Sequence, residues 1–596
     1  MKKLGFLALA IAGMLFAACS SDKDVAGGPN PNPNLENENQ FLAFNINLPS
    51  VPTSMRAADN TATLDDGLPG EYSVKNAILL VFSNEADEDD AEFKSAYEIS
   101  TQPWAKDDDP QVTTVSKKVI QEVSGVVSND LMLVILNNNG LVEVDGAAVK
   151  INGSATAFAG TYEDFRKETA TAAGLGASEM TSNGFYMANA VLANEAGSTK
   201  NGTAPTADFD VKTLVPITTI FKTHAEAEAS GSVDEIYVER GMAKVTVQQD
   251  APQVMSGVAA LKWQITGWTI DNTNTTSYLV RSTDNAATYA ALHSVADNTK
   301  DGYNNYRFMG NLAISTGSPD PYKYRTYFAE DPNFDDDATA ELTQATLGDY
   351  KATFGNDHPQ YCFENTFDVD HQNENQTTLV RLEITATVGD AAAADLFTIG
   401  DVKSTYFTRT TLIAKIQERA FDYLNENSLI TGDFESGDLT VGLPAVADLV
   451  AGEVDADDIT ITTDKGAELA GGALPANIVE KTMEYLGGKI FCYKGGKSYY
   501  TVRIKHFGDV LTPWADGVAG VDIEHIYPDA DQANNYLGRY GVLRNNWYDI
   551  QVTDVAFLGD ATPKVHTGVT DDEIKAFIAF KINILSWAKR TQQWSL

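Results

Sequence analysis

The sequence predicts an all-β protein built from antiparallel β-sandwiches. Short runs of β-branched and aromatic residues recur from residue 41 to the C-terminus, and turns rich in Asn, Gly and Asp separate them. Helical periodicity is sparse, with residues 412–425 as the best candidate and 338–345 as a shorter one. Strands with few helices between them favour antiparallel sandwiches over a parallel α/β sheet.

The first nineteen residues predict export and a lipid anchor. Two lysines, an apolar run from Leu4 to Phe16 and two alanines precede Cys19. The run is too short for a resident membrane helix, and the pattern is typical of a lipoprotein signal peptide at residues 1–19. Acyl chains on Cys19 would then anchor the precursor to a membrane leaflet. Phe16 stands where such signals usually carry Leu, and a plain secretory signal that happens to contain Cys19 is the alternative.

The strands are expected in a definite order. Residues 20–40, rich in Pro, Gly and Asn, form a tether, and 41–48 form a half-buried strand. The large apolar residues of this strand share one parity: Leu42, Phe44, Ile46 and Leu48. Further strands are expected at 74–82, 112–120, 131–136, 236–247, 263–270, 378–387, 489–493, 499–505, 547–557 and 574–587. Dividing the body near residue 245 gives a tether and first strand at 20–56, sandwiches at 57–245 and 246–570, and a C-terminal strand at 571–596.

The composition limits the partners. The chain has 43 Lys+Arg against 83 Asp+Glu, a net charge of −40. Such a charge repels nucleic-acid phosphates, so no nucleic acid is expected as a partner. No second apolar run reaches membrane-spanning length, which leaves the lipid as the expected anchor. Apart from Cys19, only Cys362 and Cys492 are present, and they either pair in an oxidising compartment or remain as two buried thiols.

No motif predicts catalysis, a cofactor or a metal. P-loop, HExxH, GxSxG and CxxC patterns are missing, and the seven histidines are scattered. Acidic residues are so abundant that no pair stands out as a glycosidase pair. Acidic clusters occur at 87–90, 335–337, 368–374 and 455–458. The one at 368–374 alternates Asp-x-Asp but lacks the Gly and the distal Glu of a calcium loop. We expect them to be solvated loops, and the protein to be no enzyme.

Two strands at opposite ends of the chain form the informative pair. The C-terminal strand has an apolar face on one parity, made by Ile574, Ala576, Ile578, Phe580, Ile582 and Ile584. The first strand has a shorter face of the same character, and Arg56 follows it. A cut between Arg56 and Ala57 by an Arg-specific protease would free this strand and open an apolar groove. Refilling the groove with four side chains recovers roughly 6–12 kcal/mol as an upper estimate.

A tail from another copy could fill such a groove by strand addition. Because the tail and the groove lie at different places on one molecule, the contact does not close on itself, and its natural product is a filament. The alternative is that both strands are ordinary members of one folded monomer and that Arg56 is a loop residue without a role.

Several segments resemble the type V pilins, which are lipoprotein-processed fimbrial subunits of Gram-negative anaerobes. Each segment is short, but their order and spacing together resemble the family over most of the chain, and most strongly after residue 360. The segments are Gly184–Asn189, Glu239–Val245, Tyr361–Thr366, Tyr499–Phe507, Tyr540–Ile550 and Ile584–Ala588. Within them, Arg544, Asn545, Asn546 and Trp547 are expected to hold a late strand in place.

The resemblance implies two transthyretin-like β-sandwich domains, export as a lipoprotein, cleavage after Arg56, and polymerisation by donor-strand exchange with residues 571–596 as the donor. It implies a stalk subunit of a cell-surface fimbria, closest to the major subunit of the short fimbria, which supports adhesion. Expected partners are copies of itself, tip and anchor subunits and the protease. A tip or anchor role is an alternative, as is a monomeric surface lipoprotein that binds glycans through Trp104, Tyr303, Tyr306 or Tyr322.

Overall fold

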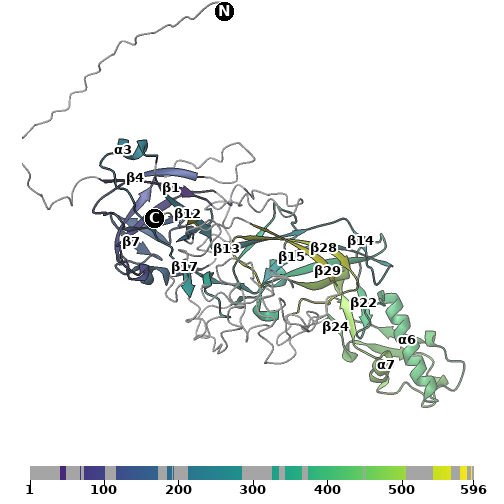
Figure 1. Cartoon of the computed structure of the whole chain (residues 1–596). Helices are drawn as coiled ribbons and strands as arrows, with labels where there is room; N and C mark the ends of the chain where they lie inside the picture. The colour runs from purple at the N-terminus through teal and green to yellow at the C-terminus, as the bar shows by residue number, and fades with distance from the viewer. Residues whose placement is uncertain are drawn as a thin grey trace, which may run out of the picture.

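The computed structural model shows an elongated molecule of mostly β-strands, with its two longest helices at one end (Figure 1). It describes residues 40–48, 68, 71, 73–100, 116–171, 184–190, 192–193, 212–231, 233–284, 325–333, 342–365, 374–446, 449, 452–504, 541–564, 578–586 and 592–593. All statements below concern these residues. The predicted all-β fold with few helices is confirmed, and the strands gather around three separate cores.

The first core is covered by the largest sheet, whose order is β3-β2-β5-β9-β12-β1-β4, with β11 paired to β5. These strands are β1 (Gln40–Asn47), β2 (Ala77–Phe82), β3 (Phe93–Ile99), β4 (Ser116–Val123), β5 (Leu131–Leu136), β9 (Met187–Asn189), β11 (Val215–Pro216) and β12 (Asp234–Arg240). All six residues of β2 are buried, as its unbroken apolar sequence requires of a central strand. The hairpin β6 (Val142–Asp145) and β7 (Ala148–Ile151), with helices α1 (Tyr162–Arg166) and α3 (His224–Ala229), completes this end.

A second, small sheet joins this first core from later in the chain. It has the order β18-β17-β8, with β8 (Thr169–Thr171), β17 (Thr276–Asp284) and β18 (Arg325–Ala329). Leu279, Val280 and Ala329 belong to the first core. The predicted boundary near residue 245 therefore stays a prediction, because the chain crosses into the second sandwich after β12 and returns through β17 and β18.

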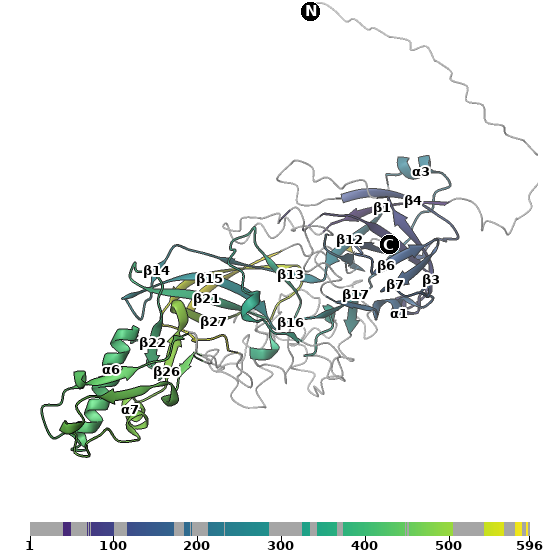
Figure 2. The same ribbon diagram turned by 180° about the vertical axis from the view of Figure 1, so that it is seen from behind.

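The second core lies between two four-stranded sheets, β20-β13-β28-β29 and β14-β15-β21-β27. Figure 2 labels the four strands of the latter sheet. Their strands are β13 (Met242–Gln248), β14 (Gln253–Val254), β15 (Leu261–Asp271), β20 (Gln360–Phe363), β21 (Leu379–Val388), β27 (Lys497–Arg503), β28 (Asn546–Val555) and β29 (Ile578–Ser586). Most pairs are antiparallel as predicted, but β13 and β28 run parallel. The short strands β16 (Thr273–Asn274) and β19 (Leu342–Thr343) pair beside this sandwich. The helix expected at 338–345 is wrong where it is described, since β19 is extended.

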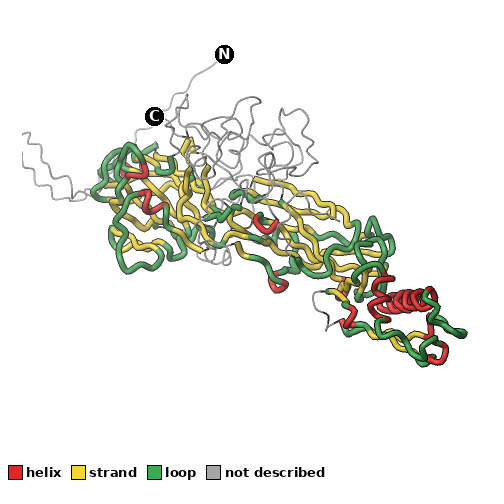
Figure 3. Tube along the Cα trace, turned by 90° about the horizontal axis from the view of Figure 1, so that it is seen from below, coloured by secondary structure: helices red, strands yellow, loops and turns green. Residues whose placement is uncertain are grey.

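The third core was not predicted and forms the helical end seen in Figure 3. Helix α6 (Arg409–Glu426) confirms the helix expected at 412–425, and the Thr408 side chain caps its first turn. Its buried residues recur every four positions and form a single stripe: Leu412, Ile416, Ala420 and Leu424. Around it lie α7 (Ile478–Leu486) and the strands β22 (Leu396–Ile399), β23 (Leu439–Gly442), β24 (Glu453–Val454), β25 (Thr460–Thr463) and β26 (Ile490–Tyr493).

Candidate functional site

The first strand lies between two partners inside the largest sheet. β1 runs parallel to β12, from the pair Phe44 and Asp234 to the pair Asn47 and Tyr237. On its other side β1 runs antiparallel to β4 along its whole length. Leu42, Phe44, Ile46 and Leu48 are at most 2% exposed and belong to the first core. Among the described residues β4 has no other strand partner, so removal of β1 would leave a strand-wide groove between β12 and β4.

The outward face of β1 is held by polar contacts. The side-chain amides of Asn45 and Asn47 both donate to the carboxylate of Glu235 on β12, at 2.6 and 2.7 Å. Both amides therefore meet one acceptor, which sets the position of β1 along β12.

A segment around α3 covers the start of the same strand. Phe41 exchanges two backbone hydrogen bonds with Phe221, of 2.9 and 2.8 Å, and its ring packs against the His224 ring in a T-shaped contact. The ammonium of Lys118 on β4 donates to the carbonyls of Glu228 and Ser230 at 3.0 and 2.7 Å. The hydrogen bonds between Phe41 and Phe221 join main-chain atoms, so they do not depend on which side chain occupies position 41.

The predicted C-terminal strand is an edge strand of the second sandwich. β29 pairs only with β28 among the described strands, antiparallel from Asn546 opposite Ser586 to Val555 opposite Ile578. Ile578 is buried and Ile582 is half-buried, whereas Ala579 and Lys581 are exposed. Phe580 and Ile584 belong to β29, and Ile574 and Ala576 lie outside the described residues. Beyond β29, β30 (Gln592–Gln593) pairs in parallel with β10 (Leu192–Ala193).

Other predicted positions lie outside the described part of the chain. They are the lipidation residue Cys19, the cleavage residues Arg56 and Ala57, and the glycan-binding candidates Trp104, Tyr303, Tyr306 and Tyr322. Within the described part, no helix is long and apolar enough to cross a membrane.

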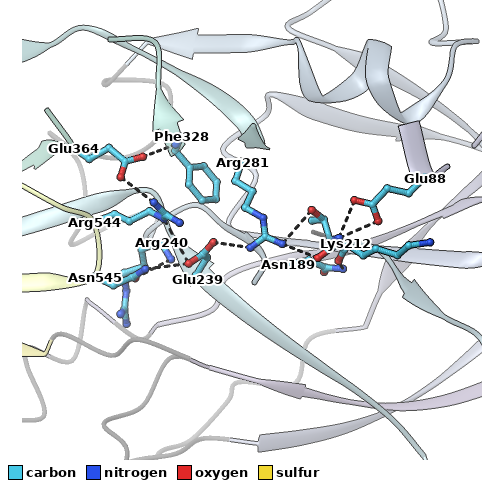
Figure 4. A network of polar contacts seen from close by, with 11 residues as sticks. Glu88, Asn189, Lys212, Glu239, Arg240, Arg281, Phe328, Glu364, Arg544 and Asn545 are labelled. Carbon is cyan, nitrogen blue, oxygen red and sulfur yellow. Dashed lines mark hydrogen bonds and ion pairs between the residues drawn. The ribbon is translucent and has the colours of Figure 1, made fainter. Parts of the chain in front are cut away.

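A buried polar network joins the two sandwiches, and sequence reasoning did not predict it (Figure 4). Arg544, before β28, contacts Glu364 at 2.9 Å and Glu239 on β12 at 3.5 Å. Arg281 on β17 contacts the other oxygen of Glu239 at 3.2 Å. The alternating charges satisfy one another away from water, which a buried charge requires. Arg544 thus has the structural surroundings expected of it, and Asn545 donates to Glu239 beside it.

The acidic clusters are not uniformly solvated, which corrects one expectation. Glu88 is buried, and its carboxylate accepts hydrogen bonds from the backbone of Thr213 and Leu214 at 2.8 to 3.1 Å. Burial raises the pKa of Glu88 to about 7. Glu374 is also buried and contacts Arg381 at 2.8 Å.

Of the two remaining clusters, the one at 335–337 lies outside the described residues and the one at 455–458 forms a turn. Residues 335–337 and 368–370 lie outside the described residues. In the cluster at 455–458 the Asp458 carboxylate caps its own turn, accepting from the backbone of Asp455 at 2.9 Å. No group of three His, Cys, Asp or Glu among the described residues is placed to hold a metal ion. Cys362 and Cys492 are buried free thiols, and burial raises the pKa of each to about 12.

Comparison with known proteins bears on the C-terminal part. Residues 521–593 match the family described as "Major fimbrial subunit protein type IV, Fimbrillin, C-terminal". This segment spans β28 and β29, and the match confirms the resemblance to fimbrial subunits that the sequence predicts. No curated protein sequence matches the chain.

Several solved structures resemble the chain at low identity. A fimbrilin from Porphyromonas gingivalis is 10% identical with a TM-score of 0.35, over 91% of this chain and 98% of that one. The tip fimbrial protein Mfa3 from the same species is 11% identical with a TM-score of 0.27, over 92% and 100%. A fimbrial assembly protein from Parabacteroides distasonis is 11% identical with a TM-score of 0.21, over 58% and 99%.

Proposed function

We propose that this protein is a polymerising stalk subunit of a cell-surface fimbria that supports adhesion. The precursor is exported as a lipoprotein, anchored to the outer membrane through Cys19, and cut between Arg56 and Ala57 by an Arg-specific protease. β1 then leaves, and the C-terminal strand of another copy takes its place. Tip and anchor subunits complete the fimbria.

The position of β1 is the observation that supports this proposal best. β1 precedes the proposed cleavage site, contributes four side chains to the first core, and pairs on both sides. Removing an edge strand would only make a sheet one strand narrower. Removing β1 instead opens a groove with unpaired backbone groups on both walls. Each apolar side chain that refills it contributes roughly 1.5–3 kcal/mol. The vacant groove is therefore an acceptor for an extended apolar strand.

The donor strand has the opposite character. Among the described strands β29 pairs with β28 alone, and two of the residues described on it are exposed. Transfer from β28 to a vacant groove between β12 and β4 gives the strand a second neighbour. The donor and acceptor surfaces differ, so each added subunit presents a new groove or a new tail, and the chain of contacts grows in one direction.

Purified precursor treated with an Arg-specific protease tests the proposal. We expect ladders of detergent-resistant oligomers from the unmodified chain and none from Arg56→Ala, which keeps β1 attached. A chain ending at residue 570 should be cut normally yet stay monomeric. A cut monomer of the full chain that never associates would contradict the proposal and favour a monomeric surface lipoprotein.

A further inference from the structure

The first strand and the C-terminal strand have nearly the same sequence. Residues 41–48 read Phe-Leu-Ala-Phe-Asn-Ile-Asn-Leu, and residues 577–584 read Phe-Ile-Ala-Phe-Lys-Ile-Asn-Ile. Both segments are read from the N-terminal to the C-terminal end, and five of the eight positions are identical. Two of the other three exchange Leu for Ile. The one change of chemistry replaces Asn45 by Lys581.

The likeness singles out one alignment of the donor in the groove. Because the direction is the same, a donor with the polarity of β1 runs parallel to β12 and antiparallel to β4. In this alignment Phe580 takes the fully buried position of Phe44. A shift by two residues keeps the apolar face inward but places Phe580 in the space of Leu42 or Ile46, where a larger ring overpacks the core.

The outward face then contains a new charged contact. Asn583 keeps the position of Asn47, whose amide donates to Glu235 at 2.7 Å. Lys581 takes the position of Asn45, which lies opposite Glu235 in the parallel pair. An ammonium facing a carboxylate makes a stronger hydrogen bond than a neutral amide does. The facing residue on β4 is Lys118, whose ammonium is engaged by two carbonyls next to α3.

Lys581 gains this partner only by exchange. Within its own chain it is exposed on β29 opposite Gln551. Among the described residues no carboxylate forms an ion pair with it. Glu235, in turn, is half-buried beside β1 and would lose both of its asparagine donors when β1 leaves.

We propose that the donor strand of a second copy occupies the groove in the register of β1, residue 577 in place of 41 through 584 in place of 48, with Lys581 against Glu235. Phe580 in the position of Phe44 selects this register over a two-residue slip in either direction, and the slip that moves Lys581 to the buried position of Ala43 also loses its pair with Glu235. This inference rests on the proposed function, since it describes how that exchange is aligned.

Disulfide trapping tests the register. In β1, Asn47 lies opposite Ser116 of β4, so Ser116→Cys with Asn583→Cys should crosslink neighbouring subunits of the polymer. Ser116→Cys with Lys581→Cys is the matched control, two residues out of register. Directly opposite positions fit disulfide geometry, so we expect at least roughly tenfold more crosslinked product from the first pair. The native Cys362 and Cys492 are buried and do not compete.

A different register and an absence of strand exchange would give different results. Polymers that crosslink through the control pair instead would overturn the register and leave strand exchange intact. Absence of polymer from the unmodified, cleaved chain would overturn the proposed function, and the register with it.

Exchanging the charges of Lys581 and Glu235 tests whether this pair contributes to assembly. Lys581→Glu places two carboxylates together, and we expect assembly of cleaved protein to slow by roughly tenfold at low salt. Adding Glu235→Lys should restore most of the rate, while Lys581→Gln should show an intermediate rate. Lys581 is exposed in its own chain, so the single variants should fold normally by circular dichroism. An unchanged rate in Lys581→Glu, or no recovery in the double variant, would refute the role of this pair.

Discussion

The carboxylate of Glu71 lies 2.8 Å from the ammonium of Lys244, and both side chains are buried at 0% and 1% exposure. The ammonium also lies 4.0 Å from the centre of the Trp547 ring, and the hydroxyl of Tyr361 donates to Glu71 at 2.6 Å. Glu71 precedes β2 of the first sandwich, whereas Lys244 and Trp547 lie on β13 and β28, which are strands of the second. This pair therefore connects the beginning of the proposed mature chain to the other sandwich.

Lys244→Met should be strongly destabilising because it removes a buried ammonium that lies 2.8 Å from the buried Glu71 carboxylate. We expect a loss of about 3–5 kcal/mol in the free energy of unfolding, measured by urea denaturation. The double variant Lys244→Met with Glu71→Gln removes both charges and should recover a large part of this loss. Equal stability of the single and double variants would show that the pair is not coupled.

Phe44→Ala should destabilise the precursor by about 3–5 kcal/mol, because the ring is fully buried and its loss leaves a cavity. Thermal unfolding of the uncut chain measures this effect. After cleavage and removal of β1, the variant and the unmodified protein have the same sequence, so their difference should vanish. A difference that persists in the cleaved monomer would mean that β1 has not left.

Glu88 should make the first sandwich less stable as the pH rises. Burial raises its pKa from 4.5 to about 7, so between these values the folded state binds more protons than the unfolded state. Stability contributed by the protonated carboxyl is present below pH 4.5 and is lost as the pH passes through about 7. The loss is on the order of 3 kcal/mol.

Glu88→Gln cannot ionise and provides the control for this pH dependence. The stability difference between the unmodified protein and the variant, followed by urea denaturation from pH 4.5 to 8, should move in favour of the variant by that amount. A difference that stays constant with pH would contradict the prediction.

Two adjacent glycines before β27 should respond differently to substitution. Gly495 and Gly496 both have positive φ, at 60° and 73°. A Cβ on Gly496 would lie 2.1 Å from the carbonyl oxygen of Ala386, whereas a Cβ on Gly495 has no neighbour within 4 Å. Gly495→Ala should lower the free energy of unfolding by about 1–2 kcal/mol, because an alanine there must adopt the left-handed backbone conformation. Gly496→Ala should lower the free energy of unfolding clearly more, because its methyl group also clashes with Ala386. Similar melting temperatures for the two variants would contradict this prediction.

The apolar patterns along the chain were enough to predict most of the strands of six or more residues, although not β3 and β17, and few of the shorter strands. Residues 131–136 coincide with β5, and the strands expected at 263–270, 378–387 and 547–557 differ from β15, β21 and β28 by at most two residues at either end. The run expected at 236–247 is divided by Gly241 into β12 and β13, which belong to different sandwiches. Period-two burial identifies a strand but carries no information about which strand lies next to it.

The sequence by itself determined that β1 and the C-terminal strand present matching apolar faces, because parity along a strand is a local property. Only the tertiary structure decided that β1 lies between β12 and β4, that Glu235 receives both of its asparagines, and that Glu239, Arg281 and Arg544 meet in the interior. Those residues are distant in sequence and strongly polar, so their local pattern indicates solvent exposure. They are buried together because the crossing of the chain between the two sandwiches brings opposite charges to one place, where each offsets the desolvation of the next.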